Sequence, residues 1–181
     1  MVGVNTVIVD DPQLSARVCC NGKGGKIKLQ PLRIVVDSNG RTPLTARIFE
    51  EPGKALIAVA RPFNKDKVKQ YEKVGAEVVE LPARSEQGMI DLEKLLEVLG
   101  QRQITSILVE GGSRLFGSLF DDGLIDKMTV FIAPIVIGGE RANSAVAGVG
   151  VETISDAFHL KNVKIQSYED NVLVSGYVGG C

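Results

Sequence analysis

The sequence predicts an α/β fold with a mixed sheet flanked by helices. Most strands of this sheet are expected to be parallel, and a C-terminal hairpin is expected to add antiparallel strands. Two observations predict it. Short runs rich in Val, Ile and Leu alternate with helical patterns over most of the chain, and two strand patterns joined by a turn close it. Because parallel strands need crossover connections, which helices usually supply, the alternating part predicts parallel pairing and the terminal pair an antiparallel edge.

Five apolar or alternating runs in the first part of the chain predict strands. They cover Val4–Asp10, Leu32–Asp37, Ala55–Ala60, Ala76–Leu81 and Ile104–Glu110. Each run is followed by turn or helix-start chemistry, which is typical of strands in α/β units.

Three helices are expected between and after these strands. The first runs from Asn64, a good N-cap, to Gly75. The second runs from Asp91 to Gly100, with leucines spaced i, i+3, i+4, i+7 on one face. The third follows Glu110 and continues through Leu119.

The last third of the chain changes character. A long strand is expected over Met128–Gly138, followed by two strands within Val163–Val178 that turn around Glu169–Asn171. No internal repeat or linker interrupts the pattern, so 181 residues predict one domain.

The composition favours a cytoplasmic protein without a nucleic-acid or membrane partner. The net charge is -1, 44% of residues are hydrophobic and 24% are charged, and no apolar stretch reaches membrane-spanning length. The three cysteines have no CxxC spacing, and there is a single histidine, so no metal site is predicted. Free thiols suit a reducing cytoplasm.

The stretch Glu110–Arg114 is the first candidate site. It combines an acid, two glycines, a serine and an arginine at the junction of a strand and a helix. Glycines let the backbone approach a ligand, and the free amides of a helix start suit a pyrophosphate. Glu110 is better placed to accept hydrogen bonds from hydroxyl or amine groups. The alternative is a bare strand–helix turn.

A second candidate lies between Asn5 and Arg17. Asp10 and Asp11 form an acidic pair, but no third ligand accompanies them, which argues against a metal site. Asp10 could instead cap the turn. Arg17 is a candidate for binding a phosphomonoester through paired charge-assisted hydrogen bonds, and its alternative is an exposed surface arginine.

A third candidate is the turn after the second predicted strand. Ser38 and Arg41 bring a hydroxyl group and a cation together, which would fit the 2′-phosphate of NADPH; alone, the stretch is also an ordinary turn. The sequence shows no nucleophile with a neighbouring base and no metal cluster, so the difficult chemistry would come from a bound cofactor.

Taken together, the stretches "GVNTVIVDDPQLSAR", "PLRIVVDSNGRTP" and "ILVEGGSRLFGSLFDDGLIDKMTVFIAPIVIGG", with the closing hairpin, resemble the riboflavin-biosynthesis reductase domain. The resemblance implies a dihydrofolate-reductase-like fold, a single reductase domain over 1–181, and a homodimer. It implies NADPH-dependent reduction of 5-amino-6-(5-phosphoribosylamino)uracil to the ribitylamino compound.

The resemblance also assigns residues. Thr6, Asp10 and Ser38 match cofactor-binding positions, and Leu14, Arg17 and Glu110 match substrate-binding ones. The helix-opening segment matches the one that holds the cofactor phosphates, namely Gly112, Ser113, Arg114, Leu115, Phe116, Gly117 and Ser118, and Gly111 joins it as the other glycine of the turn. Arg41 is added from its chemistry alone. Asp10 and Glu110 are the candidate catalytic residues, as proton donors.

The pattern departs from the family in one respect. The family domain starts earlier, with a strand and a helix that are missing from this sequence, so we expect weak NADPH binding and poor turnover by the chain as written. Two alternatives stay open: a reductase of the non-deaminated diaminopyrimidine substrate, and a non-catalytic, dimer-forming remnant of the domain.

Overall fold

The computed structural model describes residues 1–17, 30–50, 52–84, 88–140, 142 and 144–179. They belong to two compact units, residues 1–115 and residues 116–181. The three cysteines, at positions 19, 20 and 181, lie outside the described residues. The single reductase domain expected over 1–181 stays a prediction.

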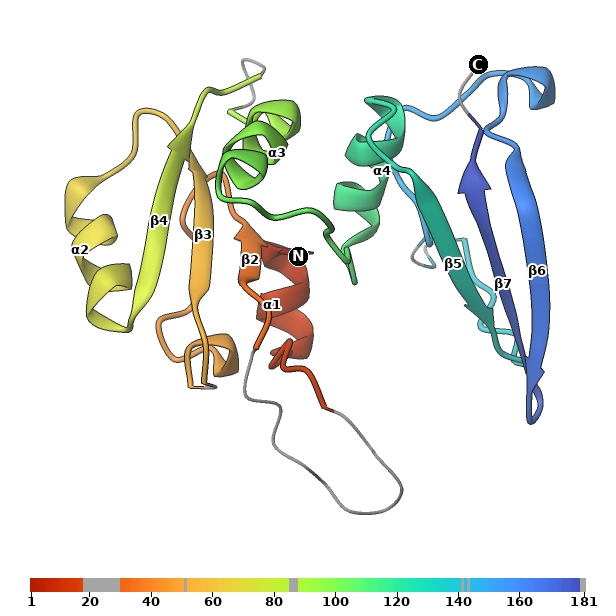
Figure 1. Ribbon diagram of the computed structural model, residues 1–181, viewed down its shortest axis with the longest axis horizontal. Coiled ribbons are helices and arrows are strands. Elements are labelled where there is room, and N and C mark those ends of the chain that lie inside the picture. The colour runs from red at the N-terminus through yellow and green to blue at the C-terminus, as the bar shows by residue number, and fades with distance from the viewer. Residues whose placement is uncertain (18–29, 51, 85–87, 141, 143, 180–181) are drawn as a thin grey trace. The chain divides into compact units, whose positions relative to one another are not determined.

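The first unit is built on a parallel sheet of four strands (Figure 1). Its order is β1 (Val2–Gly3), β2 (Arg33–Val36), β3 (Ala55–Ala60) and β4 (Ala76–Leu81). All six residues of β3 are buried, as a central strand with helices on its faces requires. The predicted strands at 32–37, 55–60 and 76–81 are confirmed.

The predicted helices are confirmed, with small shifts at their ends. They are α2 (Lys65–Lys73), α3 (Leu92–Gln101) and α4 (Ser113–Asp121). The Asn64 side chain accepts hydrogen bonds from the Asp66 and Lys67 amides, and Asp91 accepts one from the Lys94 amide, so both predicted N-caps are present. Gly100 does not end α3, which continues to Gln101.

The prediction of a strand over Val4–Asp10 is wrong. The strand β1 covers only Val2 and Gly3, before this range, and the following seven residues form helix α1 (Val4–Asp10). The valines and isoleucine favour a strand by propensity. However, the buried residues of α1 are Val4 and Val7, whereas Ile8 and Val9 are exposed, which is helical spacing. Tertiary burial has overridden local preference.

The expected strand over Ile104–Glu110 is also not formed as a regular strand. The segment lies beside β1 and is held by a few hydrogen bonds: the Glu110 amide donates to the Met1 carbonyl, and the Gly3 amide donates to the Gly111 carbonyl, at 3.0 and 3.1 Å. With only two residues in β1, too few partners are available for a continuous ladder.

The second unit carries an antiparallel sheet of three strands, in the order β5 (Lys127–Ile132), β7 (Asn171–Val178) and β6 (Leu160–Tyr168). The predicted terminal hairpin is confirmed, with its turn at Glu169 and Asp170. The strand predicted to reach Gly138 ends at Ile132, because Pro134 cannot donate to a ladder.

The α/β class is confirmed, with one difference in its sheets. The expected parallel strands and the antiparallel hairpin are both present, but they form two separate sheets rather than one mixed sheet. Short 3₁₀ turns complete the two units: η1 (Arg47–Phe49) in the first and η2 (Ile154–Asp156) in the second.

A segment around Ala147 packs tightly against α4 in the second unit. The Asp121 carboxylate accepts hydrogen bonds from the amides of Val149 and Gly150, at 2.8 and 3.1 Å. A Cβ atom added to Gly117 would overlap the backbone of Ala147 and lie 2.6 Å from the Gly148 nitrogen. Only glycine fits at this position of the helix.

Candidate functional site

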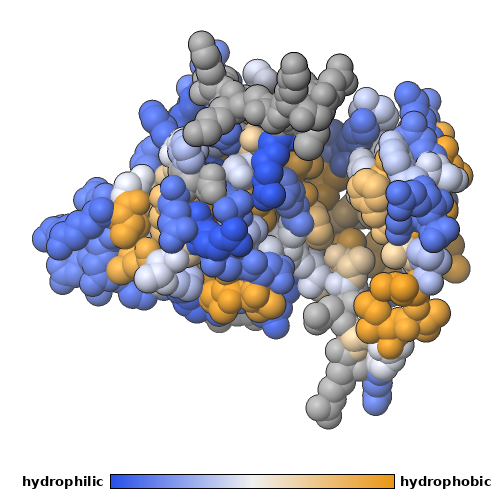
Figure 2. Space-filling view, turned by 90° about the horizontal axis from the view of Figure 1, so that it is seen from below, coloured by the Kyte–Doolittle hydropathy of each residue, from blue (hydrophilic) through white to orange (hydrophobic). Residues whose placement is uncertain are grey.

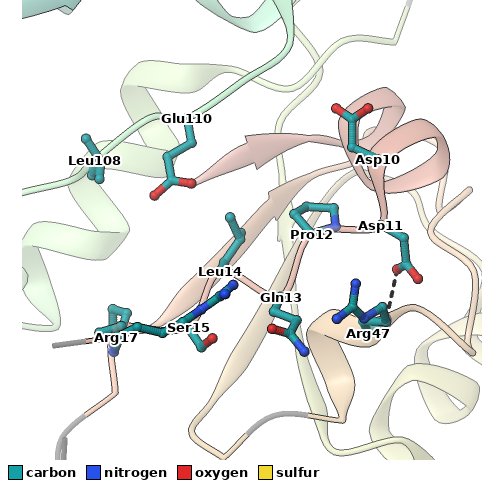
Figure 3. Close-up of a pocket in the computed structure, with 12 residues that line it drawn as sticks. Asp10, Asp11, Pro12, Gln13, Leu14, Ser15, Arg17, Arg47, Leu108 and Glu110 are labelled. Carbon is teal, nitrogen blue, oxygen red and sulfur yellow. Dashed lines mark hydrogen bonds between the residues drawn. The ribbon is translucent and has the colours of Figure 1, made fainter. Parts of the chain in front are cut away.

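A pocket of about 500 Å³ lies in the first unit (Figure 3). It is lined by segment 10–17 together with Pro31, Arg47, Leu108 and Glu110. Its volume is in the range of small-molecule sites. Four residues predicted for the site from the sequence line this pocket: Asp10, Leu14, Arg17 and Glu110.

Most charges of the pocket are separated in space; the exception is Asp11, whose carboxylate lies beside Arg47. In Figure 3, Glu110 and Asp10 lie on one side, whereas Arg17, Gln13 and Arg47 lie on the other. A ligand that carries an anion at one end and hydroxyl or amine groups at the other would match this arrangement. Arg17 and Glu110 therefore line one cavity.

The lining segment is held by its backbone. Asp11 ends α1 in the left-handed conformation (φ 42°, ψ 57°), and its amide donates to the Val7 carbonyl. Further along, the side-chain amide of Gln30 bonds both backbone groups of Ala16, at 2.9 and 3.3 Å. The residue before Arg17 is thereby fixed, which sets where the guanidinium can reach.

The glycine turn lies at the carboxyl end of β1. Gly112 has φ 94°, a conformation that favours glycine, and a Cβ atom at Gly111 would lie 3.2 Å from the Thr6 hydroxyl oxygen. Thr6 therefore packs on the turn, one helical turn before Asp10 on α1. The structure brings Thr6, Gly111 and Gly112 together next to the start of α4 at Ser113.

The remaining residues of the predicted phosphate-binding segment have different surroundings. Arg114 is exposed and Leu115 is buried. Phe116 and Ser118 are partly buried, and Gly117 is covered by Ala147. Gly117 is therefore in contact with protein, and the early part of the segment offers the more accessible backbone amides.

The loop after β2 holds the other two predicted cofactor residues. Arg41 donates to the Asn5 side chain at 2.9 Å, and the Ser38 hydroxyl accepts from the Ile90 amide at 3.1 Å. Neither residue lines the pocket. Since Asn5 and Thr6 are adjacent, the first turn of α1 contacts both this loop and the glycine turn.

Buried polar groups fix this loop in place. The Asp37 carboxylate accepts from the amide and the hydroxyl of Thr42, both at 2.7 Å, and the Tyr71 hydroxyl donates to the Thr42 carbonyl. Burial, with Asp37 nearby, raises the pKa of Tyr71 to about 12. From α2, the Lys67 ammonium donates to the Gly40 carbonyl at 2.8 Å.

Sequence reasoning missed Gln13 and Arg47, which both line the pocket. Arg47 lies just outside the recognised motifs, between Ala46 and Ile48. Both of these neighbours are buried, so Arg47 has to point away from the core. In the sequence, Arg47 is recognisable only as a basic residue between two apolar ones, and this pattern does not indicate a pocket.

Two negative findings apply to the described part of the chain. Its His, Cys, Asp and Glu side chains form no group of three that could hold a metal ion. Its helices include none that is long and apolar enough to cross a membrane.

The profile of the RibD C-terminal domain family matches residues 1–174. The chain belongs to this family. The match extends over most of both compact units, including the pocket, the glycine turn and the first strand of the terminal hairpin.

Relatives of the RibD C-terminal domain family include bacterial and archaeal proteins. Riboflavin biosynthesis protein RibD of Actinobacillus pleuropneumoniae is 34% identical over 175 residues, which are 96% of this chain and 44% of that protein. The 2,5-diamino-6-ribosylamino-4(3H)-pyrimidinone 5′-phosphate reductase of Methanothermobacter thermautotrophicus is 34% identical over 180 residues, 99% of this chain and 79% of that protein. The chain thus spans less than half of the RibD protein and most of the archaeal one.

Solved structures show the same fold. Acinetobacter baumannii RibD, in its form 1, superposes with a TM-score of 0.80 at 27% identity, over 99% of this chain and 46% of that one. A yeast riboflavin biosynthesis reductase superposes with a TM-score of 0.66 at 20% identity, over 98% of this chain and 73% of that one. The fold expected from the resemblance is confirmed.

Proposed function

We propose that the protein is an NADPH-dependent reductase of riboflavin biosynthesis. It reduces 5-amino-6-(5-phosphoribosylamino)uracil to 5-amino-6-(5-phosphoribitylamino)uracil. The observation that supports this most directly is the pocket shared by Arg17 and Glu110, in a chain that belongs to the RibD C-terminal domain family. The names of the relatives, which specify riboflavin biosynthesis and a pyrimidinone phosphate reductase, support the same reaction class.

The residues of the pocket have separate roles in this proposal. Arg17 binds the substrate phosphate, Leu14 packs against the sugar, and Glu110 accepts hydrogen bonds from hydroxyl or amine groups. A proton has to reach the sugar ring oxygen or the imine nitrogen, and Asp10 and Glu110 are the candidates to deliver it. Catalysis then consists mainly of holding the substrate in a reactive position.

NADPH would supply a hydride. The glycine turn fits such a dinucleotide, because Gly112 has the left-handed conformation and a side chain at Gly111 would press on Thr6. The free amides of Ser113 and Arg114 at the start of α4 would hold the cofactor phosphates. Arg41 and Ser38 would lie near the 2′-phosphate, which distinguishes NADPH from NADH.

The reaction is tested by offering the chain the deaminated substrate with NADPH and following the loss of nicotinamide absorbance. Arg17→Ala should raise KM about 10- to 100-fold, with a smaller change in kcat, because it removes substrate binding distant from the reacting atoms. Because slow turnover is expected, the assay uses a high NADPH concentration and long incubation; a chain that then reduces neither this substrate nor its non-deaminated form would contradict the proposal.

The role of Arg41 has its own test. Arg41→Ala should reduce the preference for NADPH over NADH by about 10-fold or more, since one charge-assisted phosphate contact is lost. Arg102→Ala is the matched control, because Arg102 pairs with Glu77 on the surface and belongs neither to the pocket nor to the loop after β2. An unchanged preference in Arg41→Ala would remove this residue from the cofactor site.

A second candidate substrate is favoured by one observation. The archaeal relative at 34% identity is named for the non-deaminated 2,5-diamino compound, and the chain covers 79% of that protein. Parallel assays with both pyrimidines distinguish the two, because the two substrates differ in a single amino or oxo group on the ring.

A homodimer in the cytoplasm is part of the proposal. In the second unit, several large apolar side chains are exposed, and orange surface is visible on the right of Figure 2. They include Phe131, Ile132, Val163, Ile165 and Tyr168. Exposed apolar surface of this kind marks interaction sites.

Variants from the two faces of the sheet would locate the contact. Phe131 shares a face with Gln166, whereas Ile165 lies on the opposite face, as the strand register requires. Sedimentation of Phe131→Lys and Ile165→Lys should show loss of the dimer for one face and not for the other. A wild-type chain that stays monomeric at high concentration would exclude the homodimer.

A further inference from the structure

Two arginines in the pocket, Arg17 and Arg47, have guanidinium groups that contact no hydrogen-bond or ion-pair partner among the residues that the structure describes. Within the described ranges, neither Arg17 nor Arg47 donates a side-chain hydrogen bond, and neither forms an ion pair. Other arginines of the first unit, such as Arg41, Arg61 and Arg102, donate side-chain hydrogen bonds to carbonyl, amide or carboxylate oxygens. The two pocket arginines are thus available to a ligand.

The backbone directs Arg47 into the pocket. Ala46 and Ile48, on either side of it, are 4% and 0% exposed, and Phe49 packs against Tyr71 with ring centroids 6.4 Å apart. With its neighbours in the core, Arg47 has to point outward. Figure 3 shows its side chain on the same side of the pocket as Arg17, with Gln13 between them.

Asp11 fixes the start of this turn. Its carboxylate accepts a hydrogen bond from the Arg47 backbone amide at 2.9 Å. The contact joins the end of α1 to η1, two segments 36 residues apart. One acid of the Asp10–Asp11 pair is therefore occupied in positioning Arg47, and this explains a carboxylate beside a site for an anion.

We propose that Arg47 is a second phosphate-binding residue, which holds the phosphomonoester of the ligand together with Arg17, and that Asp11 is its positioning residue. The inference deepens the proposed function and rests on it for the identity of the substrate. A phosphate dianion has three acceptor oxygens, so it can accept from two guanidinium groups on different sides and from the Gln13 amide. Glu110, on the opposite side of the pocket, then faces the polyhydroxy or ring part of the ligand.

Binding is measured without turnover, by NMR titration of the full chain with ribose 5-phosphate and with ribose. Arg47→Ala should weaken ribose 5-phosphate binding about 10-fold and leave ribose binding unchanged, whereas Arg47→Lys should recover part of the loss. Lys69→Ala, on the exposed face of α2, controls for the loss of one positive charge. If Arg47→Ala binds ribose 5-phosphate as tightly as the wild type does, while Arg17→Ala binds it more weakly, Arg47 does not bind the phosphate and the proposal is overturned.

The positioning role of Asp11 is tested by comparing two variants, Asp11→Asn and Asp11→Ala. Asn can keep both the left-handed backbone and the oxygen that accepts from the Arg47 amide, so Asp11→Asn should retain phosphate binding. Asp11→Ala should weaken it several-fold while ribose binding stays the same. If Asp11→Asn weakens binding as much as Asp11→Ala, the carboxylate does not act through Arg47. Failure of the reductase assay with intact ribose 5-phosphate binding would reject the proposed reaction alone.

Discussion

Replacing Gly117 by alanine should destabilise the protein, although alanine is the better helix former. The added Cβ would overlap the backbone of Ala147, a neighbour that cannot rotate away as a flexible side chain could. The segment would have to move by about 1 Å or more to restore an ordinary C···O contact. That movement would disturb the two hydrogen bonds that Asp121 accepts from Val149 and Gly150.

The magnitude follows from three contributions. Overpacking of a tight contact costs about 1–3 kcal/mol. Weakening two exposed hydrogen bonds adds about 1–2 kcal/mol, and the helix propensity of alanine returns about 1 kcal/mol. The free energy of unfolding of Gly117→Ala should therefore fall by about 1–4 kcal/mol.

Gly100→Ala is the matched control. Gly100 is also a helical glycine, in the last part of α3, but a Cβ atom there meets nothing within 4 Å. This variant should raise the free energy of unfolding by about 0.5–1 kcal/mol. Urea unfolding followed by circular dichroism measures both, and amide shifts of Val149 and Gly150 report the local movement. The packing argument is refuted if Gly117→Ala is as stable as Gly100→Ala.

Three further predictions concern stability and positioning. Between pH 10 and about 12 the wild type should lose about 2–3 kcal/mol of its free energy of unfolding, because the tyrosine of the unfolded chain releases its proton at a lower pH than the buried Tyr71 does. Tyr71→Phe should not show this loss, and stability curves of both proteins against pH check this. Asn64→Ala should lower the free energy of unfolding by about 1 kcal/mol through loss of the α2 cap, and thermal melting that matches wild type would contradict it. Gln30→Ala should weaken ribose 5-phosphate binding several-fold by releasing the backbone before Arg17, which NMR titration measures; unchanged binding would show that the clamp is not needed.

The parts of the fold that could be predicted are those specified locally. The helix α2 has its cap in Asn64, and α3 has both a cap in Asp91 and a leucine stripe, so their starts follow from a few adjacent residues. The strands β3 and β4 are recognisable as short apolar or alternating runs between turns. In each case propensity, periodicity and capping agree.

The parts that could not be predicted depend on distant contacts. The helix α1 is rich in β-branched residues, and only the burial of Val4 and Val7 against the sheet shows its helical period. The segment 104–110 does not form the expected strand, because its partner β1 is only two residues long. Similarly, Arg17 and Glu110 carried recognisable chemistry, whereas Arg47 enters the pocket through the burial of its neighbours.

The loop after β2 alternates between two kinds of residue. Asp37, Gly40 and Thr42 are buried and supply the contacts that shape it, whereas Asn39 and Arg41 are exposed. The residues that build the loop are therefore different from the ones that it displays. Natural selection, or a protein engineer, can exchange the displayed pair to change what this surface recognises, while the loop itself keeps its shape.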